Sequence, residues 1–357
     1  MPNRKRKPLF SLAIACRIAL NLQALNNEGT ENNRLIPRQV SLVVPTRDPD
    51  GQPHYIVEEV HAISGDMLKH IFMDYLRLIA LDRGLPLCDA CRALHPGRML
   101  GNAEFTRQLA DQNNPTFWDT TDKGQRLNGA RVTDQLLTCV LDDLGGTLIP
   151  VGDGVRRESP LDFGWIAGVP ELTHTRQYIH TRHAANLAAR KPDGNDADSE
   201  QPQINSGQML FERTASSGVY ALLAHLSVYD IGYNRYARDY PAEVNGIPLD
   251  RAARLEATLL ALTETLRYPK GALTSTQMPH PVNLEGYLSL STTAAIAAPM
   301  ISPLHVDYIA ATQALLGPLE RLHGKDKVSI HLFHSEAELL ALTADILNTY
   351  APARLVR

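Results

Sequence analysis

Hydrophobic and polar positions alternate along the first apolar segment of the chain. Apolar residues occupy every second position over residues 10–20, and small residues together with Arg17 fall between them. This period of two predicts a strand with one buried face and one face of small residues. The small face leaves room for a ligand to lie on the sheet, although a partner subunit could also cover it.

Later segments follow the period of either a strand or a helix. Further strands are predicted over residues 40–44, 55–60, 220–233, 284–292 and 328–333. Helices are predicted from Ser64 or Asp66 to about residue 82, over 133–144 and 249–267, near 305–322, and after the capping box Ser335-x-x-Glu338. This order indicates an α+β chain with a ferredoxin-like sheet that carries insertions.

Residues 166–215 differ from the rest of the chain. Basic and aromatic residues alternate over 174–183, a polar and turn-rich tip follows at 190–199, and an apolar second arm returns at 208–213. Two arms around a loose tip predict a long hairpin that projects from the body. A surface loop that packs nowhere is the alternative. Residues 83–130 are interpreted as a helical and irregular insertion.

Composition and charge restrict the kind of function. The chain has 357 residues, of which 44% are hydrophobic and 21% are charged, and its formal net charge is -4. This charge argues against a protein whose whole surface embraces nucleic acid. Any nucleic-acid site must therefore be local, or built largely from amides, backbone and shape. The apolar segment 9–20 is too short and too polar for a membrane span, so a cytoplasmic protein without membrane contact is expected.

Four cysteines over this length do not make a disulfide framework, which is typical of a protein in a reducing cytosol. Cys88-x-x-Cys91, with His95 nearby, raises the possibility of zinc. Tetrahedral zinc needs four ligands, or three and a water, and no second Cys/His pair lies at the usual spacing. A buried thiol pair or a loop is the favoured interpretation, so neither a metal nor a cofactor is predicted, and the metal alternative remains open.

Residues 21–38 are the strongest candidate for a binding site. This stretch follows the first strand and holds five asparagines and Gln23, with Arg34 and Arg38 at its end. An amide-rich loop around a glycine can present side-chain and backbone donors to a phosphate chain. It contains no Lys, His or Cys, and hence no obvious proton shuttle, nucleophile or metal cage. The same residues are also typical of a simple hairpin connection.

Two further positions combine positive charge with a helix end. Lys69 and His70 lie in the first turn of the helix that begins near residue 65, where a basic residue opposes the helix dipole and therefore suggests an anion partner. Arg267, Lys270 and Gly271 form a basic, glycine-bearing turn that can hold a phosphate. Packing, or the need to complement a dipole, could equally place these residues there.

Four blocks together carry a family resemblance. They are residues 21–33 followed by Pro-Arg, residues 64–70 (Ser-Gly-Asp-Met-Leu-Lys-His), residues 229–234 (Tyr-Asp-Ile-Gly-Tyr-Asn), and residues 268–272 with 278–280 (Tyr-Pro-Lys-Gly-Ala and Met-Pro-His). In this order and spacing, from about residue 9 to 290, they resemble the Cas7 backbone subunits of type I CRISPR Cascade complexes, in the DevR/Cst2 branch. No block is specific on its own.

The resemblance implies an RRM-like palm over about 9–82, 131–165 and 216–292, a thumb over 166–215 and a C-terminal extension over 293–357, all in one domain. It implies an antiviral ribonucleoprotein in which several copies line a CRISPR RNA, target DNA is recognised through guide pairing, and Cas5, Cas6 and a Cas8-type large subunit are partners. In the family the thumb displaces a guide nucleotide, with Met209 and Phe211 as candidates here. The expected RNA-binding residues are Arg17, Asn21, Gln23, Asn26, Asn27, Arg38, Ser64, Lys69, His70, Arg176, Met209, Phe211, Arg267, Lys270 and Gly271.

The expected protein is not an enzyme. Type III relatives cut target RNA with an aspartate in the loop that matches residues 24–38, and here that loop holds Glu28 and Glu31 but no Asp. The aromatic RNP boxes of single RRM proteins are also absent, so isolated binding by base stacking is not expected. Two alternatives remain: an RNA endonuclease or other hydrolase that uses residues such as Asp142 and Asp143, and a multimeric scaffold without nucleic acid.

Overall fold

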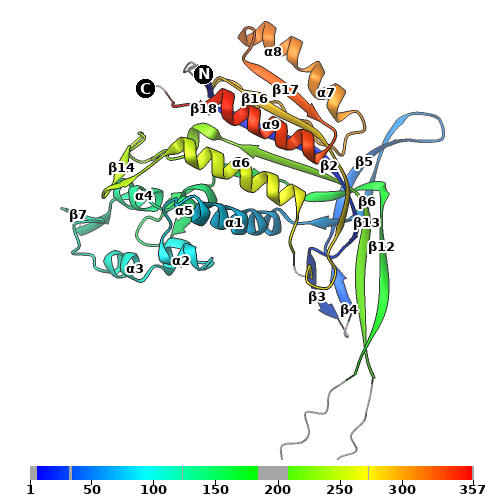
Figure 1. Ribbon diagram of the computed structural model, residues 1–357, viewed down its shortest axis with the longest axis horizontal. Coiled ribbons are helices and arrows are strands. Elements are labelled where there is room, and N and C mark those ends of the chain that lie inside the picture. The colour runs from blue at the N-terminus through cyan, green and yellow to red at the C-terminus, as the bar shows by residue number, and fades with distance from the viewer. Residues whose placement is uncertain (1–5, 32–33, 123, 184–207, 272, 356–357) are drawn as a thin grey trace, which may run out of the picture.

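One large sheet runs through the molecule, with the larger layer of helices on one face and two shorter helices over part of the other (Figure 1). The computed structural model describes residues 6–31, 34–122, 124–183, 208–271 and 273–355. Neighbouring strands along the main path of the sheet pair antiparallel. In spatial order they are β17 (Val328–Phe333), β16 (His280–Ser291), β2 (Ser11–Gln23), β13 (Gln208–Leu226), β12 (Ile166–His183), β6 (Pro53–Ile63) and β5 (Gln39–Arg47).

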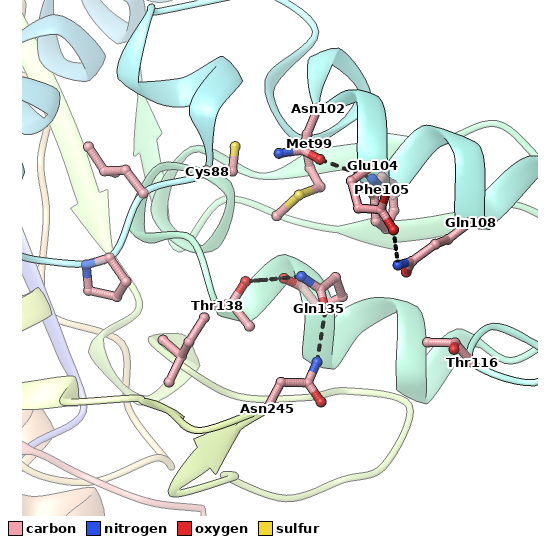
Figure 2. A pocket seen from close by; sticks show the side chains of 13 residues that line it. Cys88, Met99, Asn102, Glu104, Phe105, Gln108, Thr116, Gln135, Thr138 and Asn245 are labelled. Atoms are coloured by element: carbon pink, nitrogen blue, oxygen red, sulfur yellow. Dashed lines mark hydrogen bonds between the residues drawn. The ribbon is translucent and has the colours of Figure 1, made fainter.

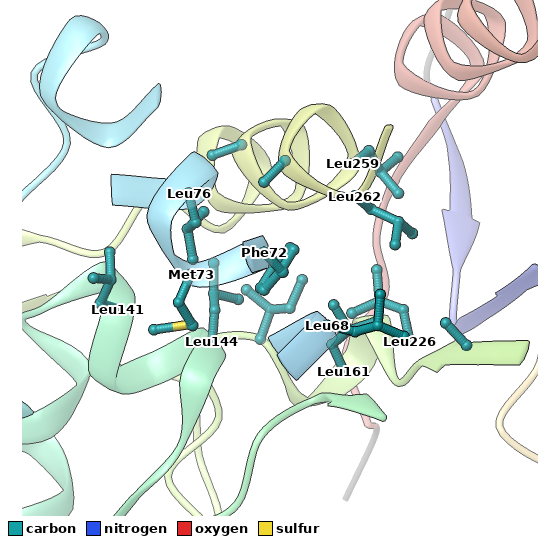
Figure 3. Packing of buried hydrophobic residues seen from close by; sticks show 14 of the residues in the cluster. Leu68, Phe72, Met73, Leu76, Leu141, Leu144, Leu161, Leu226, Leu259 and Leu262 are labelled. Carbon is teal, nitrogen blue, oxygen red and sulfur yellow. The ribbon is translucent and has the colours of Figure 1, made fainter. Parts of the chain in front are cut away.

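The helical face holds the main hydrophobic core. It is formed by α1 (Gly65–Asp82), α6 (Arg251–Arg267) and α9 (Glu336–Thr349). Leu68 and Phe72 of α1 and Leu259 and Leu262 of α6 belong to one buried cluster, together with Leu226 of β13 (Figure 3). Leu68 and Phe72 lie on the buried side of α1, and all three helices are predicted from the sequence.

The small residues of β2 suggest an open face with room for a ligand. In the structure this face of β2 is covered. Ala13 and Ala15 are completely buried, and Ala15 packs with Tyr308 at the start of α7 (Tyr308–Ala314). Arg17 from the same face donates hydrogen bonds to the carbonyl oxygens of Pro303 (3.0 Å) and His305 (3.2 Å). The chain's own C-terminal part therefore occupies the space that the sequence left for a ligand.

Two predicted helices and one predicted strand are interrupted. Residues 133–144 form α4 (Gly129–Leu137) and α5 (Val140–Gly145), because Cys139 has extended backbone angles between them. The helix predicted near 305–322 is divided into α7 and α8 (Leu316–His323). The strand predicted over 220–233 ends at Leu226, and a 3-10 turn, η2 (Val228–Asp230), follows it.

The insertion between α1 and α4 is more regular than its polar sequence indicated. Trp118 anchors it, since its side chain is 6% exposed and its indole N–H donates to the carbonyl of Leu109 (3.1 Å). The elements are α2 (Asp89–Arg92), η1 (Arg98–Gly101), α3 (Ala103–Ala110), β7 (Trp118–Thr121) and β8 (Gly124–Leu127). Short strands complete the fold: β1 (Lys7–Leu9) with β18 (Tyr350–Pro352), β9 (Thr147–Ile149) with β10 (Val155–Arg157), β14 (Glu243–Val244) with β15 (Ile247–Pro248), and β11 (Leu161–Phe163) against β13.

A long two-stranded hairpin leaves the body, made by β12 and β13 (Figure 1). The strands pair antiparallel from Thr173 opposite Gly218 as far as the last described residues of each arm, and the register shifts between Gly168 and Thr173. A β-carbon at Gly218 would lie 2.4 Å from the carbonyl oxygen of Leu172. Glycine is therefore needed opposite Thr173, where the backbones of the two strands approach closely beside the register shift.

Candidate nucleic-acid interface

The asparagine-rich stretch folds into a small hairpin at the base of the long one. Its strands are β3 (Asn27–Glu31) and β4 (Arg34–Pro37), and β4 lies beside β13 (Figure 1). The plain hairpin that turn residues favour is thus the local structure. A hairpin in this position is still compatible with a binding role, because β4 brings the end of this stretch next to β13.

A break in the alternation at the end of β2 shapes this stretch. Leu22 has a left-handed backbone (φ 57°), an uncommon conformation for a branched residue, and its side chain is 46% exposed. Gln23 consequently turns inward and is fully buried. Its amide nitrogen contacts the Tyr220 hydroxyl (2.9 Å) and His61 Nδ1 (2.8 Å), and its amide oxygen accepts from the Leu25 N–H (3.0 Å). The predicted contact of Gln23 with RNA does not fit this geometry, because its polar atoms already have protein partners.

Asn26 and Ser64 join the asparagine-rich stretch to the start of α1. The Asn26 side-chain oxygen accepts a hydrogen bond from the Ser64 N–H (2.8 Å), and the Asn26 carbonyl accepts from the Arg38 N–H (3.2 Å). The Ser64 hydroxyl in turn caps α1 by accepting from the Met67 N–H (3.2 Å). Asn26 and Ser64 are each 7% exposed. They therefore position the surface residues around them.

Asn27, Arg38 and Trp165 lie around the contact between Asn26 and Ser64, and each of them has atoms or a ring face that could bind a ligand. Among the described residues, Asn27 Oδ1 and Arg38 Nε are buried without a hydrogen-bond partner. The Arg38 guanidinium carbon lies 5.6 Å from the centre of the Trp165 ring, and Arg38 Nε is 3.9 Å from the Glu28 carboxylate. Trp165 is 44% exposed. Proteins that bind single-stranded nucleic acid use such groups: cations and amides contact the phosphates, and aromatic rings stack on the bases.

Trp165 is a residue of this surface that the sequence did not indicate. It lies just before β12 and outside every block that resembles the family, and a lone tryptophan has no local signal of exposure. Its position at the root of the arms, one of only two tryptophans in the chain, is the signal that could have found it.

The turn after α6 packs directly on the asparagine-rich stretch. A β-carbon at Gly271 would lie 2.7 Å from both the Cα and the carbonyl oxygen of Leu25, so this position accepts only glycine without movement. Lys270 Nζ lies 4.4 Å from the centre of the Tyr75 ring and 3.6 Å from an Asp74 carboxylate oxygen, and its side chain is 40% exposed. Two of the predicted segments thus meet in space.

Arg267, which precedes this turn, has a different environment. Its guanidinium makes ion pairs with Glu264 (2.7 Å) and with Glu336 of α9 (3.3 Å). The charge of Arg267 therefore stabilises the contact between α6 and α9, and a predicted phosphate contact would have to compete with two carboxylates.

Lys69 lies in a different part of the surface from the asparagine-rich stretch. It lines a polar groove of about 500 Å³, none of whose lining residues comes from the asparagine-rich stretch. Burial lowers the pKa of Lys69, and the nearby charge of Arg98 lowers it further. The other residues of this groove that carry charge are Arg156, Arg157, Glu158, Asp162, Asp230 and Arg235.

The remaining predicted contacts lie on the surface or partly outside the described side chains. Asn21 is exposed at the end of β2, His70 is exposed on α1, and Arg176 is exposed on β12. The backbones of Met209 and Phe211 belong to β13, opposite Arg182 and His180 respectively, but their side chains lie outside what the structure describes.

The acids considered for a hydrolase are inaccessible. Asp142 and Asp143 are both completely buried. Asp143 accepts hydrogen bonds from Arg157 (2.5 Å) and Arg254 (2.5 Å), and although burial alone would raise the pKa of Asp143, these two guanidinium groups hold it below its ordinary value. This carboxylate pair cannot meet a substrate from solvent. Across the described ranges, no helix is long and apolar enough to cross a bilayer.

The fold and this surface define an α+β protein with a projecting hairpin and an amide-rich cationic patch at its base. The family model described as "CRISPR-associated negative auto-regulator DevR/Csa2" matches residues 14–313, and the chain belongs to this family. The family resemblance carried by the four sequence blocks is thereby confirmed.

Individual proteins are also similar to this chain. CRISPR-associated protein Cas7/Csa2 1 of Saccharolobus solfataricus is 25% identical over 260 residues, which cover 71% of this chain and 72% of that protein. A chain of a CRISPR RNA-guided surveillance complex described as pre-nicking is 13% identical with a TM-score of 0.43, and the match covers 94% of this chain and 99% of that one. Csc2 of Thermofilum pendens is 14% identical with a TM-score of 0.34, over 96% and 86% of the two chains.

Proposed function

We propose that this chain is a CRISPR RNA-binding backbone subunit of a type I Cascade complex, and that copies of it lie side by side along the guide. Membership of the DevR/Csa2 family over residues 14–313 supports this role. The observation that carries it is the surface at the hairpin base, where Asn27, Arg38 and Trp165 offer an amide, a cation and an aromatic ring together. The partners in this proposal are CRISPR RNA, target DNA paired to the guide, further copies, and Cas5, Cas6 and a Cas8-type subunit.

The arrangement of the chain supports a finer proposal for its parts. The elements β2, α1, β12, β13, α6 and β16 follow one another in the β-α-β-β-α-β order of a ferredoxin-like, or RRM-like, palm. In this proposal the palm comprises about 9–82, 131–165 and 216–292, and the hairpin within 166–215 is the thumb. Residues 83–130 are an insertion and 293–357 an extension of the same domain.

The predicted RNA-binding residues divide into two roles. Those proposed to hold the sugar-phosphate chain are exposed or incompletely paired: Asn21, Asn27, Arg38, Arg176, Lys270 and the backbone at Gly271, with Lys69 and His70 as a separate phosphate contact. Those proposed to position them are buried or ion-paired: Gln23, Asn26, Ser64 and Arg267. Arg17 is proposed to hold the segment at Pro303 and His305 against β2, through hydrogen bonds to their carbonyl oxygens. Met209 and Phe211 remain the proposed wedge of the thumb.

This subunit is proposed to bind and not to cut. Residues 24–38 contain no aspartate, and Glu28 lies 3.9 Å from Arg38, which offsets its charge. Incubating the guide-bound assembly with complementary RNA and Mg²⁺ should leave the RNA intact. Fragments at a regular spacing would contradict this proposal and would indicate that Glu28 or Glu31 acts as a nuclease residue.

Coexpression with a CRISPR array and the partner subunits tests the binding role. The purified assembly should have a nucleic-acid absorbance ratio and release RNA of uniform length. Arg38→Ala combined with Lys270→Ala should lower the RNA retained per chain, whereas Arg107→Ala should not, because Arg107 is an exposed arginine on α3 paired with Glu104. A multimer that contains no RNA would support the scaffold alternative instead.

A further inference from the structure

Three thiols and one carboxylate converge where the insertion meets the body. Cys88 precedes α2 and Cys91 lies within it, whereas Cys139 precedes α5 and Asp142 lies within it. One ligand atom from each of these four residues lies within 4.8 Å of the others. The sequence contains this arrangement as Cys-x-x-Cys followed by Cys-x-x-Asp, and a search for a second Cys/His pair misses the second half.

The spacing of these atoms suits a tetrahedral metal ion. Bond lengths of about 2.3 Å to sulfur and 2.0 Å to oxygen place the ligand atoms of tetrahedral zinc about 3.5–3.8 Å apart. Asp142 Oδ2 lies 3.3 Å from the Cys91 sulfur and 3.8 Å from the Cys88 sulfur. The Cys91 N–H points at the Cys88 sulfur from 3.4 Å, which favours the thiolate form that binds metal.

The carboxylate is held in the orientation of a ligand. Asp142 Oδ1 accepts hydrogen bonds from the Met99 N–H (3.0 Å) and the Thr147 hydroxyl (2.6 Å), so Oδ2 is the oxygen that faces the sulfurs. Partners of this kind fix the direction of a ligand and are a regular part of metal sites. Cys91, Cys139 and Asp142 are each at most 1% exposed, as in closed structural sites.

A route for the ion is also present. Cys88 is only partly buried and is among the side chains that line a cavity of about 550 Å³ between the insertion and α4 (Figure 2). A metal could enter from this cavity and reach the three buried ligands past the Cys88 sulfur. His95 is not part of the cluster, since neither ring nitrogen is among the ligand atoms that converge there, and its Nδ1 accepts from the Gly97 N–H (3.0 Å).

We propose that Cys88, Cys91, Cys139 and Asp142 bind one structural Zn²⁺ ion, which fastens the insertion to α5. Soft thiolate ligands in tetrahedral geometry favour zinc over magnesium, calcium or manganese. A disulfide between Cys88 and Cys91 would use only two of the four groups and leave Cys139 facing a buried carboxylate. The ion would also fix the start of α5, on which Asp143 and its two arginine partners depend.

Metal analysis of the full chain, purified without chelator, tests this proposal. About one zinc per chain is expected from elemental analysis, and Cys91→Ser and Cys139→Ser should lose it. Cys16→Ala is the matched control, since Cys16 is the fourth cysteine and is buried in β2 outside the cluster. His95→Gln should also retain zinc. A metal-free chain, a Cys88–Cys91 disulfide detected by mass spectrometry, or zinc that survives Cys139→Ser would overturn the proposal.

A second pair of variants separates metal loss from failure to fold. Asp142→Cys offers four thiolates and should retain zinc, whereas Asp142→Ala should lose it. Chain loaded with Co²⁺ in place of zinc should absorb in the visible and near ultraviolet with the bands of tetrahedral cobalt bound to thiolate, and Asp142→Cys should strengthen the sulfur band. Octahedral cobalt spectra, or equal zinc content in the two Asp142 variants, would count against these ligands.

Discussion

Two polar regions of this chain differ in how fully their charged and polar groups are paired. In the body, Asp143 lies between Arg157 and Arg254, all at most 2% exposed, and each charge has an opposite charge within 2.5 Å. At the base of the long hairpin, Asn27 Oδ1 and Arg38 Nε have no hydrogen-bond partner among the described residues. Buried polar groups are normally paired. Arg157 Nη1 in the body also has no hydrogen-bond partner among the described residues, but it lies 3.4 Å from the buried carboxylate of Asp230. Arg38 Nε has a weaker ion pair, 3.9 Å from the half-exposed carboxylate of Glu28, so we expect the hairpin base to accept a bound partner more readily than the body does.

The largest effect should come from breaking the self-sufficient region. Asp143→Asn removes a carboxylate that both buried arginines share and leaves Arg157 with Asp230 at 3.4 Å, so it should lower the free energy of unfolding by about 3–5 kcal/mol. Denaturant titration measures this change. Glu104→Gln is the control, since Glu104 is exposed and contacts Arg107 and Gln108 of its own helix, and it should leave the unfolding midpoint nearly unchanged. Equal effects of the two variants would mean that the cluster is not a stabilising element.

His61, which lies beneath the asparagine-rich stretch, should make stability depend on pH. Gln23 uses its amide N–H₂ toward His61, so His61 Nδ1 must accept and stay unprotonated. Burial lowers the pKa of His61 from 6.5 to about 4. Between these values the unfolded chain binds more protons, so stability is full above pH 6.5 and falls, by about 3 kcal/mol in total, as the pH drops toward 4.

The matched variant for this pH dependence is His61→Asn. Its side-chain oxygen can accept from Gln23 as Nδ1 does, but it does not titrate. Unfolding free energies measured from pH 4 to 8 should fall less steeply for this variant than for the parent chain. Parallel curves would assign the acid sensitivity to other groups, for instance to the carboxylates of the ion pairs.

Local patterns predicted the elements of this fold, and long-range packing decided what the sequence could not. The sequence predicts Ser64 or Asp66 as the cap of α1, and Ser64 is the cap, because a cap and its helix are adjacent in the chain. The strand predicted over residues 328–333 has the observed bounds. The covered face of β2 escaped prediction, since Tyr308 and the carbonyls that bind Arg17 come from almost 300 residues away.

The candidate site was predictable as a region but not residue by residue. The asparagines and the turn at Gly271 were recognised separately, and their contact through Leu25 is visible only in three dimensions. Gln23 looked like its amide neighbours, yet the left-handed backbone at Leu22 turned it into the core. Nothing in the local sequence distinguishes an inward amide from an outward one.

Gly271→Ala should have an intermediate effect on stability, and it tests whether the hairpin base depends on its contact with the turn after α6. The added β-carbon would meet the Leu25 backbone at 2.7 Å, so the turn and the asparagine-rich stretch must separate. Overpacking of this kind costs about 1–3 kcal/mol, and both thermal stability and retained RNA should fall. Gly317→Ala in α8 is the control, because its β-carbon would lie no closer than 3.8 Å to another residue. If RNA retention is the same for both variants, the contact between the two segments does not shape the interface.

The smallest effect in free energy should come from Arg38 alone. Arg38→Ala removes one proposed phosphate contact and should weaken binding of single-stranded RNA by about 1 kcal/mol, roughly fivefold. Because each contact with single strands contributes about 0.7 to the dependence of log K on log salt, the slope should become shallower by about that amount. Fluorescence anisotropy over a salt series measures both quantities. Arg107→Ala should change neither, whereas an unchanged slope for Arg38→Ala would leave Glu28 and Trp165 as the only partners of this guanidinium and make the hairpin base as self-contained as the body.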